Sequence, residues 1–168
     1  YPNIQGANPW IMVTWGEAKN LCAAQGKRMC TEEEWTFACE GEEALPYPYG
    51  YERSDENCNI DKGWRPFSAA RLAHRWTRGP NRFSHAAGEL EKLWQGQPSG
   101  SRPGCVSPFG VYDMTGSVDE WTSSVRRGGH PSILKGGYWG PVRTRCRPST
   151  RSHDEIHTFY QQGVRCCQ

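Results

Sequence analysis

Two amphipathic segments near the start of the chain are each introduced by a helix-capping motif. Thr14 and Glu17 have the spacing of a capping box, in which each side chain satisfies a free backbone amide at a helix start. Apolar residues then recur at helical spacing, and we expect this helix to end at Gly26. Its buried face is expected to contain Trp15, Ala18, Leu21 and Cys22.

A second capping box follows at Thr31 and Glu34. The acidic residues that follow Thr31 suit the positive end of a helix dipole, which strengthens the prediction of a helix. We expect Trp35, Ala38 and Cys39 to face inward from it. These two segments carry the clearest helical patterns in the chain.

The middle of the chain, from Gly41 to about Gly104, has poor periodicity and many turn residues. We expect a long ordered loop region there, held in place by three tryptophans, with a short helix across residues 85–94. The three tryptophans are Trp64, Trp76 and Trp94.

Short apolar stretches separated by turn residues follow Cys105 and predict a small antiparallel sheet. The expected strands are 111–114, 118–123, 133–138 and 164–167. With no linker or repeat in the sequence, we expect a single domain over residues 1–168.

Composition supports a loop-rich fold that contains large aromatic side chains. Only 36% of the 168 residues are hydrophobic, whereas 19 are glycine, 12 proline and 8 tryptophan. The net charge of +2 lacks the basic excess of a nucleic-acid-binding surface, so we expect no nucleic-acid partner. No apolar run reaches the length of a membrane helix, and we expect no membrane insertion.

Eight cysteines spread along such a chain indicate a disulfide framework, and therefore an oxidising compartment. Zinc is the alternative, but zinc sites usually contain Cys-x-x-Cys pairs and this chain has none. No leader-like segment follows Tyr1, so we expect a mature or trimmed chain that is secreted, periplasmic or displayed on the cell surface.

Several stretches, in one order, resemble the formylglycine-generating enzyme (sulfatase-modifying factor) domain family. Residues 15–39 resemble the first pair of helices in this family. The family's central signature is resembled by Phe-Gly-Val-Tyr-Asp-Met-Thr-Gly-Ser-Val-Asp-Glu-Trp-Thr at 109–122. Three further stretches resemble the family's C-terminal strands: Lys-Gly-Gly-Tyr-Trp at 135–139, Arg-Cys-Arg at 145–147 and Gly-Val-Arg-Cys at 163–166. The resemblance implies an α+β fold of the C-type lectin-like kind, with few short helices, small twisted antiparallel sheets and long ordered loops.

The resemblance also implies disulfides Cys22–Cys166 and Cys39–Cys146. We assign the other four cysteines to Cys58–Cys105 and Cys30–Cys167, although the sequence alone does not determine these two pairs.

Catalytic members of the family hold copper with two cysteine thiolates between the Gly-Gly and the Arg-Cys of the C-terminal strands. The corresponding interval here, residues 138–145, is shortened and contains no cysteine, histidine or methionine. Because copper(I) requires soft ligands, we expect neither copper nor oxidase activity and assign no catalytic residue. Tyr138 and Trp139 are expected to fill the substrate groove, and together with Arg143 they are our candidates for a ligand groove.

The resemblance implies a structural calcium ion held by the Asp113 and Glu120 side chains and by the Gly116 and Val118 carbonyls. Carboxylate and carbonyl oxygens are the ligands that Ca²⁺ prefers. The alternative is that both acids only satisfy loop amides.

A second calcium site of the family would use the Asn59 side chain, the Ile60 carbonyl and an acid between residues 89 and 95. Lys92 stands where that acid is expected, which weakens the second prediction.

Two further patterns each have a functional and a structural interpretation. His153 and His157 are spaced to bind zinc if they are helical, but a solvated loop suits them better. Five C-terminal arginines could recognise an anion, although bracing of the loops through ion pairs is the interpretation we favour. They are Arg143, Arg145, Arg147, Arg151 and Arg165.

The sequence therefore predicts a non-catalytic, calcium-stabilised binding or structural domain. Its partner would be a protein, a peptide or a glycan. The alternatives are a formylglycine-generating oxidase acting on a protein cysteine and a lectin-like carbohydrate-binding domain, although the calcium–sugar motifs of true C-type lectins are absent.

Overall fold

Both predicted capping boxes begin helices in the computed structural model, which describes residues 5–68, 87–124 and 129–168. Helix α1 (Trp15–Ala23) is capped by Thr14, whose hydroxyl accepts the Glu17 amide. Helix α2 (Glu32–Glu40) is capped in the same way by Thr31 and Glu34. The two predicted helices are therefore confirmed.

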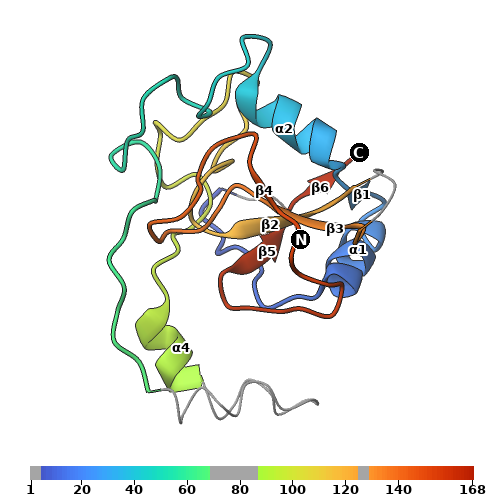
Figure 1. Cartoon of the computed structure of the whole chain (residues 1–168), viewed down its shortest axis with the longest axis vertical. Coiled ribbons are helices and arrows are strands. Elements are labelled where there is room, and N and C mark those ends of the chain that lie inside the picture. The colour runs from blue at the N-terminus through green and yellow to red at the C-terminus, as the bar shows by residue number, and fades with distance from the viewer. Residues whose placement is uncertain (1–4, 69–86, 125–128) are drawn as a thin grey trace.

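A four-stranded sheet in the order β4-β3-β2-β5 lies at the centre of the molecule (Figure 1). Strand β2 (Asp119–Ser123) pairs antiparallel with β3 (Ser132–Lys135) and parallel with β5 (Gln162–Val164). The edge strand β4 (Ser149–Thr150) pairs antiparallel with β3. In the view of Figure 1, α1 and α2 lie on one side of this sheet and the loop that follows α2 lies on the other.

A second sheet joins residues that are far apart in the chain. Strand β1 (Arg28–Met29) pairs antiparallel with β6 (Cys166–Cys167), so the last residues of the chain lie beside the turn between the two helices. The predicted strand 164–167 is therefore divided between two sheets. The division occurs at Arg165, whose side chain bonds to Glu120 on β2.

Two other strand predictions need correction. Residues 111–114 form no strand, only an isolated bridge between Val106 and Tyr112, because the left-handed backbone of Asp113 (φ 58°) interrupts extended structure. The strand expected over 133–138 ends at Lys135, since Gly136 and Gly137 both have positive φ. The sheet also contains one parallel pair, which the antiparallel prediction missed.

The C-terminal end of the long middle region, residues 41–104, packs against the core. Helix α4 (Ala87–Leu93) lies within the predicted range 85–94, and the Trp94 ring that follows it packs edge-on against Trp139 at 4.8 Å. Trp64, by contrast, is 62% exposed and does not belong to the core. Trp76 lies outside the described residues.

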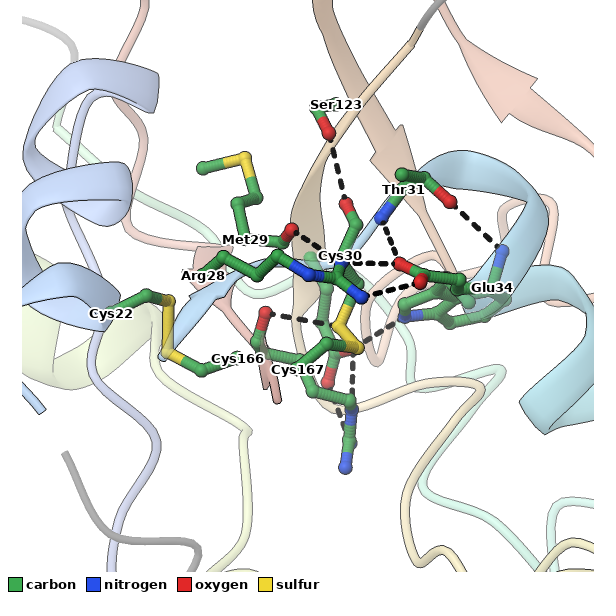
Figure 2. Close-up of a disulfide and its surroundings, with 12 residues drawn as sticks. Cys22, Arg28, Met29, Cys30, Thr31, Glu34, Ser123, Cys166 and Cys167 are labelled. Atoms are coloured by element: carbon green, nitrogen blue, oxygen red, sulfur yellow. Dashed lines mark hydrogen bonds and ion pairs between the residues drawn. A yellow bond between two sulfur atoms is a disulfide. The ribbon is translucent and has the colours of Figure 1, made fainter. Parts of the chain in front are cut away.

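Four disulfides hold the fold together, and their pairs are the four expected. Figure 2 shows the adjacent Cys166 and Cys167 reaching in different directions, the first to α1 and the second to the start of α2. Each bond closes a long loop, for which chain entropy gives about 3–5 kcal/mol of stabilisation. The bonds are Cys22–Cys166, Cys30–Cys167, Cys39–Cys146 and Cys58–Cys105. They indicate that the protein matures in an oxidising compartment.

The core is divided into small clusters around buried tryptophans. Trp121 packs with residues of α1 and β3, Trp35 packs beside the Cys39–Cys146 disulfide, and Trp139 packs with residues of α4. In the part of the chain that the structure describes, no helix is both long enough and apolar enough to cross a membrane.

The turn at Gly137 generates the first prediction. Gly137 has φ 74°, and a Cβ atom there would overlap the Arg143 carbonyl oxygen. Gly26 has a similar φ of 67° with open space around its Cα. Gly26→Ala should cost about 1–2 kcal/mol for the left-handed backbone alone. Gly137→Ala should cost about 1–3 kcal/mol more because of the overlap. Denaturant unfolding of both variants measures the difference, and equal losses would contradict the close approach.

Candidate functional site

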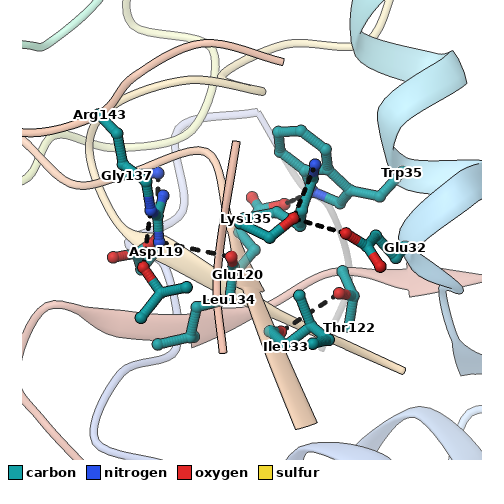
Figure 3. Close-up of polar contacts among 12 residues, drawn as sticks. Glu32, Trp35, Asp119, Glu120, Thr122, Ile133, Leu134, Lys135, Gly137 and Arg143 are labelled. Carbon is teal, nitrogen blue, oxygen red and sulfur yellow. Dashed lines mark hydrogen bonds and ion pairs between the residues drawn. The ribbon is translucent and has the colours of Figure 1, made fainter. Parts of the chain in front are cut away.

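Two adjacent acids on β2 occupy opposite faces of the strand, as alternation requires. Asp119 is 8% exposed, and its Oδ1 accepts hydrogen bonds from the Gly137 amide at 3.0 Å and from Arg143 Nη2 at 2.9 Å. Burial raises the pKa of Asp119, while Arg143 opposes that rise. Figure 3 shows Asp119 with Gly137 and Arg143 on one side, and Glu120 toward Trp35 on the other.

Glu120, an expected calcium ligand, has a full set of protein partners. Its Oε2 accepts hydrogen bonds from Trp35 Nε1 at 2.6 Å and from Arg165 Nε at 2.8 Å, and its Oε1 accepts Arg165 Nη2 at 2.7 Å. Both side chains are largely buried. The Arg165 guanidinium therefore neutralises this carboxylate, and calcium would have to share it.

Asp113, the other expected carboxylate, is differently placed. Its Oδ2 accepts the Gly100 amide at 2.7 Å, and it forms no ion pair within the described residues. It lines a cavity of about 300 Å³ together with Arg165 and Tyr112. Burial raises the pKa of Asp113, as expected for a carboxylate without a direct counter-charge. The charges that act on Asp113 are Glu120, Arg165 and Arg102, so two arginines face the two acids.

The two expected calcium regions lie against each other. The Ser117 amide, within the first region, donates to the Asn59 carbonyl at 3.0 Å. Asn59 is 2% exposed, and its Nδ2 donates to the Gln95 carbonyl at 2.8 Å. Its Oδ1 is buried without a hydrogen-bond partner. A buried acceptor of this kind is costly unless a donor, a water or a cation satisfies it.

In the second region, Lys92 stands where the resemblance places an acid. Lys92 pairs with Glu89 at 2.9 Å, and Arg65 Nη1 donates to the carbonyls of Lys92 and Trp94. Ile60, whose carbonyl was the other expected ligand, is fully buried. The structure thus brings Asn59 and Ile60 to the Gly116 loop.

The expected ligand groove is mostly interior. Trp139 is 1% exposed and packs against Trp94 and Tyr160, so it is not available to a ligand. Arg143 bonds to Asp119 and, through Nε, to Thr150 Oγ1 at 2.6 Å. Tyr138 and Arg143 are both partly exposed, whereas Trp139 is buried. The two left-handed glycines before Tyr138 turn the chain inward and place Trp139 in the core.

The sequence model of the sulfatase-modifying factor enzyme 1-like domain matches residues 3–168. The chain belongs to this family. It is 29% identical over 154 residues to the inactive C-alpha-formylglycine-generating enzyme 2 of Bos taurus, covering 85% of this chain and 44% of the relative. It is 28% identical over 163 residues to the formylglycine-generating enzyme of Mus musculus, covering 95% of this chain and 38% of the relative. The chain thus spans less than half the length of these relatives.

Solved structures share the fold of this family member. CarF superposes with a TM-score of 0.62 at 18% identity, covering 96% of this chain and 67% of CarF. PvdO from Pseudomonas aeruginosa gives a TM-score of 0.59 at 22% identity, covering 94% of this chain and 60% of PvdO. These similarities support the α+β fold expected from the sequence.

The resemblance places the copper-binding cysteines of catalytic family members between the Gly-Gly turn and the Arg-Cys strand. Here Cys146 follows that interval and is bonded to Cys39. All eight cysteines of the chain are in disulfides. No pair of thiolates is therefore available in this structure.

The two candidate zinc ligands have a geometry that does not suit chelation. The rings of His153 and His157 stack at 3.9 Å with an interplanar angle of 12°. A metal ion bound by both rings would have to lie in both ring planes, and nearly parallel stacked planes do not meet at the ion. Across residues 5–68, 87–124 and 129–168, no three His, Cys, Asp or Glu side chains are grouped to hold a metal. The loop interpretation fits these histidines.

The C-terminal arginines form the structural contacts that we favoured over recognition of an anion. Four of the five pair with acids from distant parts of the chain, and Arg145 donates to the Tyr47 hydroxyl at 3.3 Å. The ion pairs are Arg143–Asp119, Arg147–Glu40, Arg151–Glu32 and Arg165–Glu120.

Sequence reasoning missed a fully buried lysine on β3. Lys135 has no exposed surface, and its Nζ donates to the Arg147 carbonyl at 2.8 Å and lies 5.2 Å from the centre of the Trp35 ring. Burial lowers the pKa of Lys135 to about 8, although the nearby Glu32 opposes this shift. In the sequence, a lone lysine at the end of a strand is indistinguishable from a solvent-exposed one.

This lysine predicts an unusual pH dependence of stability. Between a folded-state pKa of about 8 and the ordinary value of 10.5, the unfolded chain binds a proton that the folded chain does not. Stability should therefore rise with pH in this window, by about 1–2 kcal/mol between pH 7.5 and 9.5. Urea unfolding of the wild type and of Lys135→Met at several pH values isolates the contribution. A difference between the two that stays constant with pH would refute the assignment.

Proposed function

We propose that this protein is a non-catalytic binding or structural domain of its family, which acts outside the reducing cytoplasm in the periplasm, at the cell surface or after secretion. One observation carries the proposal: every cysteine is in a disulfide, and none lies in the interval 138–145. Copper(I) sites depend on soft ligands such as thiolates. The inward position of Trp139 supports the same conclusion, because an indole occupies the interior beneath that interval.

The names of the relatives favour this function without deciding it. Two relatives are called inactive formylglycine-generating enzymes, in Bos taurus and Mus musculus. Others are called formylglycine-generating enzyme and hercynine oxygenase. The second candidate function is therefore a formylglycine-generating oxidase that acts on a protein cysteine.

An activity assay separates the two functions. Incubated with copper(I), oxygen and a peptide containing Cys-x-Pro-x-Arg, the protein should leave the cysteine unchanged, because no thiolate pair holds the metal. Mass spectrometry of the peptide detects the conversion of the cysteine to an aldehyde. An active family enzyme assayed in parallel is the positive control. Aldehyde above the level of a protein-free control would establish the oxidase instead.

We also propose that calcium stabilises the fold at the Asp113–Glu120 loop. Asp113 forms no ion pair among the described residues; its Oδ2 accepts a hydrogen bond from the Gly100 amide, and the residue lines a cavity that could admit an ion. Asp113, Gly116 and Ser117 all have positive φ, so the loop is tightly curved. Curved loops of this kind can turn several oxygens toward one ion, as calcium requires. The orphaned Asn59 Oδ1 in the neighbouring region is a further oxygen donor.

Thermal unfolding with calcium and with a chelator tests this site. A ligand that binds only the folded state at a hundredfold excess over Kd adds about 2.7 kcal/mol. For a chain of this size, the Tm should then differ by roughly 5–10 °C between the two conditions. An unchanged Tm in the wild type would show that the two acids are loop braces only.

Three variants assign the effect to individual carboxylates. Asp113→Asn keeps a side chain that tolerates left-handed backbone, and it should remove most of the calcium response. Glu120→Gln should lower the Tm in both conditions, since it breaks the pair with the buried Arg165, a loss of about 3–5 kcal/mol. Glu33→Gln, at an exposed acid on α2 outside both expected calcium regions, is the control and should respond like the wild type.

A further inference from the structure

A large aromatic surface lies beside the shortened interval. Trp64 is 62% exposed, although tryptophan is a residue that proteins usually bury. Its ring lies 5.9 Å from that of Tyr138, a candidate groove residue that is partly exposed. Gly140 lies under both rings, since a Cβ atom there would come within 2.7 Å of Tyr138 and 3.1 Å of Trp64. Because Gly140 has no side chain, the two rings can pack close to its backbone.

The loop that carries Trp64 is fixed to the same interval by two hydrogen bonds to main-chain carbonyls. The Lys62 amide donates to the Trp139 carbonyl at 2.8 Å. Arg53 Nη2 donates to the Val142 carbonyl at 3.1 Å. The indole is therefore presented on an anchored loop, and little conformational entropy would be lost when a ligand binds.

A planar pair of polar side chains adjoins this aromatic surface. Arg53 and Asp61 share two hydrogen bonds of 2.7 and 2.6 Å, and each side chain is 34% exposed. The two side chains hold each other in position and still reach solvent. They can present donors and acceptors to a ligand lying on Trp64.

The surroundings of the pair are positively charged. Arg53 and Arg145 both approach the Tyr47 hydroxyl, so the two guanidinium groups belong to one surface. Arg145 is exposed and has no acidic partner among the described residues. With Asp61 counted, this surface has one positive charge in excess.

We propose that this surface, formed by Trp64, Tyr138, Arg53, Asp61 and Arg145, binds an acidic polysaccharide. A pyranose ring has an apolar face of C–H groups that stacks on an exposed indole, while its hydroxyls exchange hydrogen bonds with planar polar side chains. The excess positive charge favours a sugar that carries carboxylates. This inference rests on the proposed binding function and gives its ligand a chemical class.

A peptide ligand fits the observations less well. Peptide-binding sites are commonly apolar grooves in which side chains insert. Here the aromatic surface is open and bordered by an ion pair, and the apolar cavity beside Leu90 and Trp94 lies over different residues.

Affinity electrophoresis of the intact protein in gels that contain polygalacturonate, dextran or poly-glutamate tests the proposal. Polygalacturonate should retard the wild type, dextran should retard it less, and poly-glutamate, which has charge without sugar rings, should not retard it. Trp64→Ala should weaken binding to polygalacturonate at least tenfold. Arg145→Gln should reduce the preference for polygalacturonate over dextran.

Phe37→Ala is the matched control, because Phe37 is 52% exposed on α2 and its ring packs against Phe109. It should bind like the wild type, and the thermal unfolding of each variant should show that it is folded. Binding that survives Trp64→Ala, or that poly-glutamate reproduces, would overturn the proposal. Loss of polysaccharide binding would leave the aldehyde assay unaffected, so the inference and the proposed function can fail separately.

Discussion

The ion pair between Glu120 and Arg165 is the interaction on which the centre of this fold depends. Glu120 lies in the middle of the sheet, and burying its charge without a partner would be costly. Arg165 supplies two bonds and Trp35 supplies a third, so a β2 residue, an α2 residue and a C-terminal residue meet at one carboxylate. Because Cys166 and Cys167 follow Arg165 directly, the same segment carries the disulfides to α1 and to the start of α2.

Asp119 extends this arrangement to the other face of β2. Its pair with Arg143 holds the segment 138–145, where the resemblance places the copper-binding cysteines of catalytic members. In this chain the segment is short, turns on two left-handed glycines and sends Trp139 into the core. The same packing leaves Tyr138 beside Trp64.

Charged side chains in this protein are stabilised in two ways. Most buried acids are paired with arginines from the C-terminal third, such as Glu32 with Arg151. Two charged groups are held differently: the half-buried Asp113 has an amide bond and an adjacent cavity, and the buried Lys135 donates to a main-chain carbonyl and lies against an indole. Unbalanced buried charges are costly unless another group binds them. They are where cation binding and pH dependence are expected.

The sequence by itself determined the features that depend on local spacing or on motif order. Both capping boxes join residues three apart, and they predicted α1 and α2 correctly. The family and its α+β fold followed from motifs in one order, and the resemblance supplied two disulfide pairs. Only the tertiary structure decided the pairing of β1 with β6, the parallel pairing of β2 with β5, the burial of Lys135 and the interior position of Trp139. Each of these depends on contacts between segments far apart in the chain, where a residue's type gives no information about which partner will cover it.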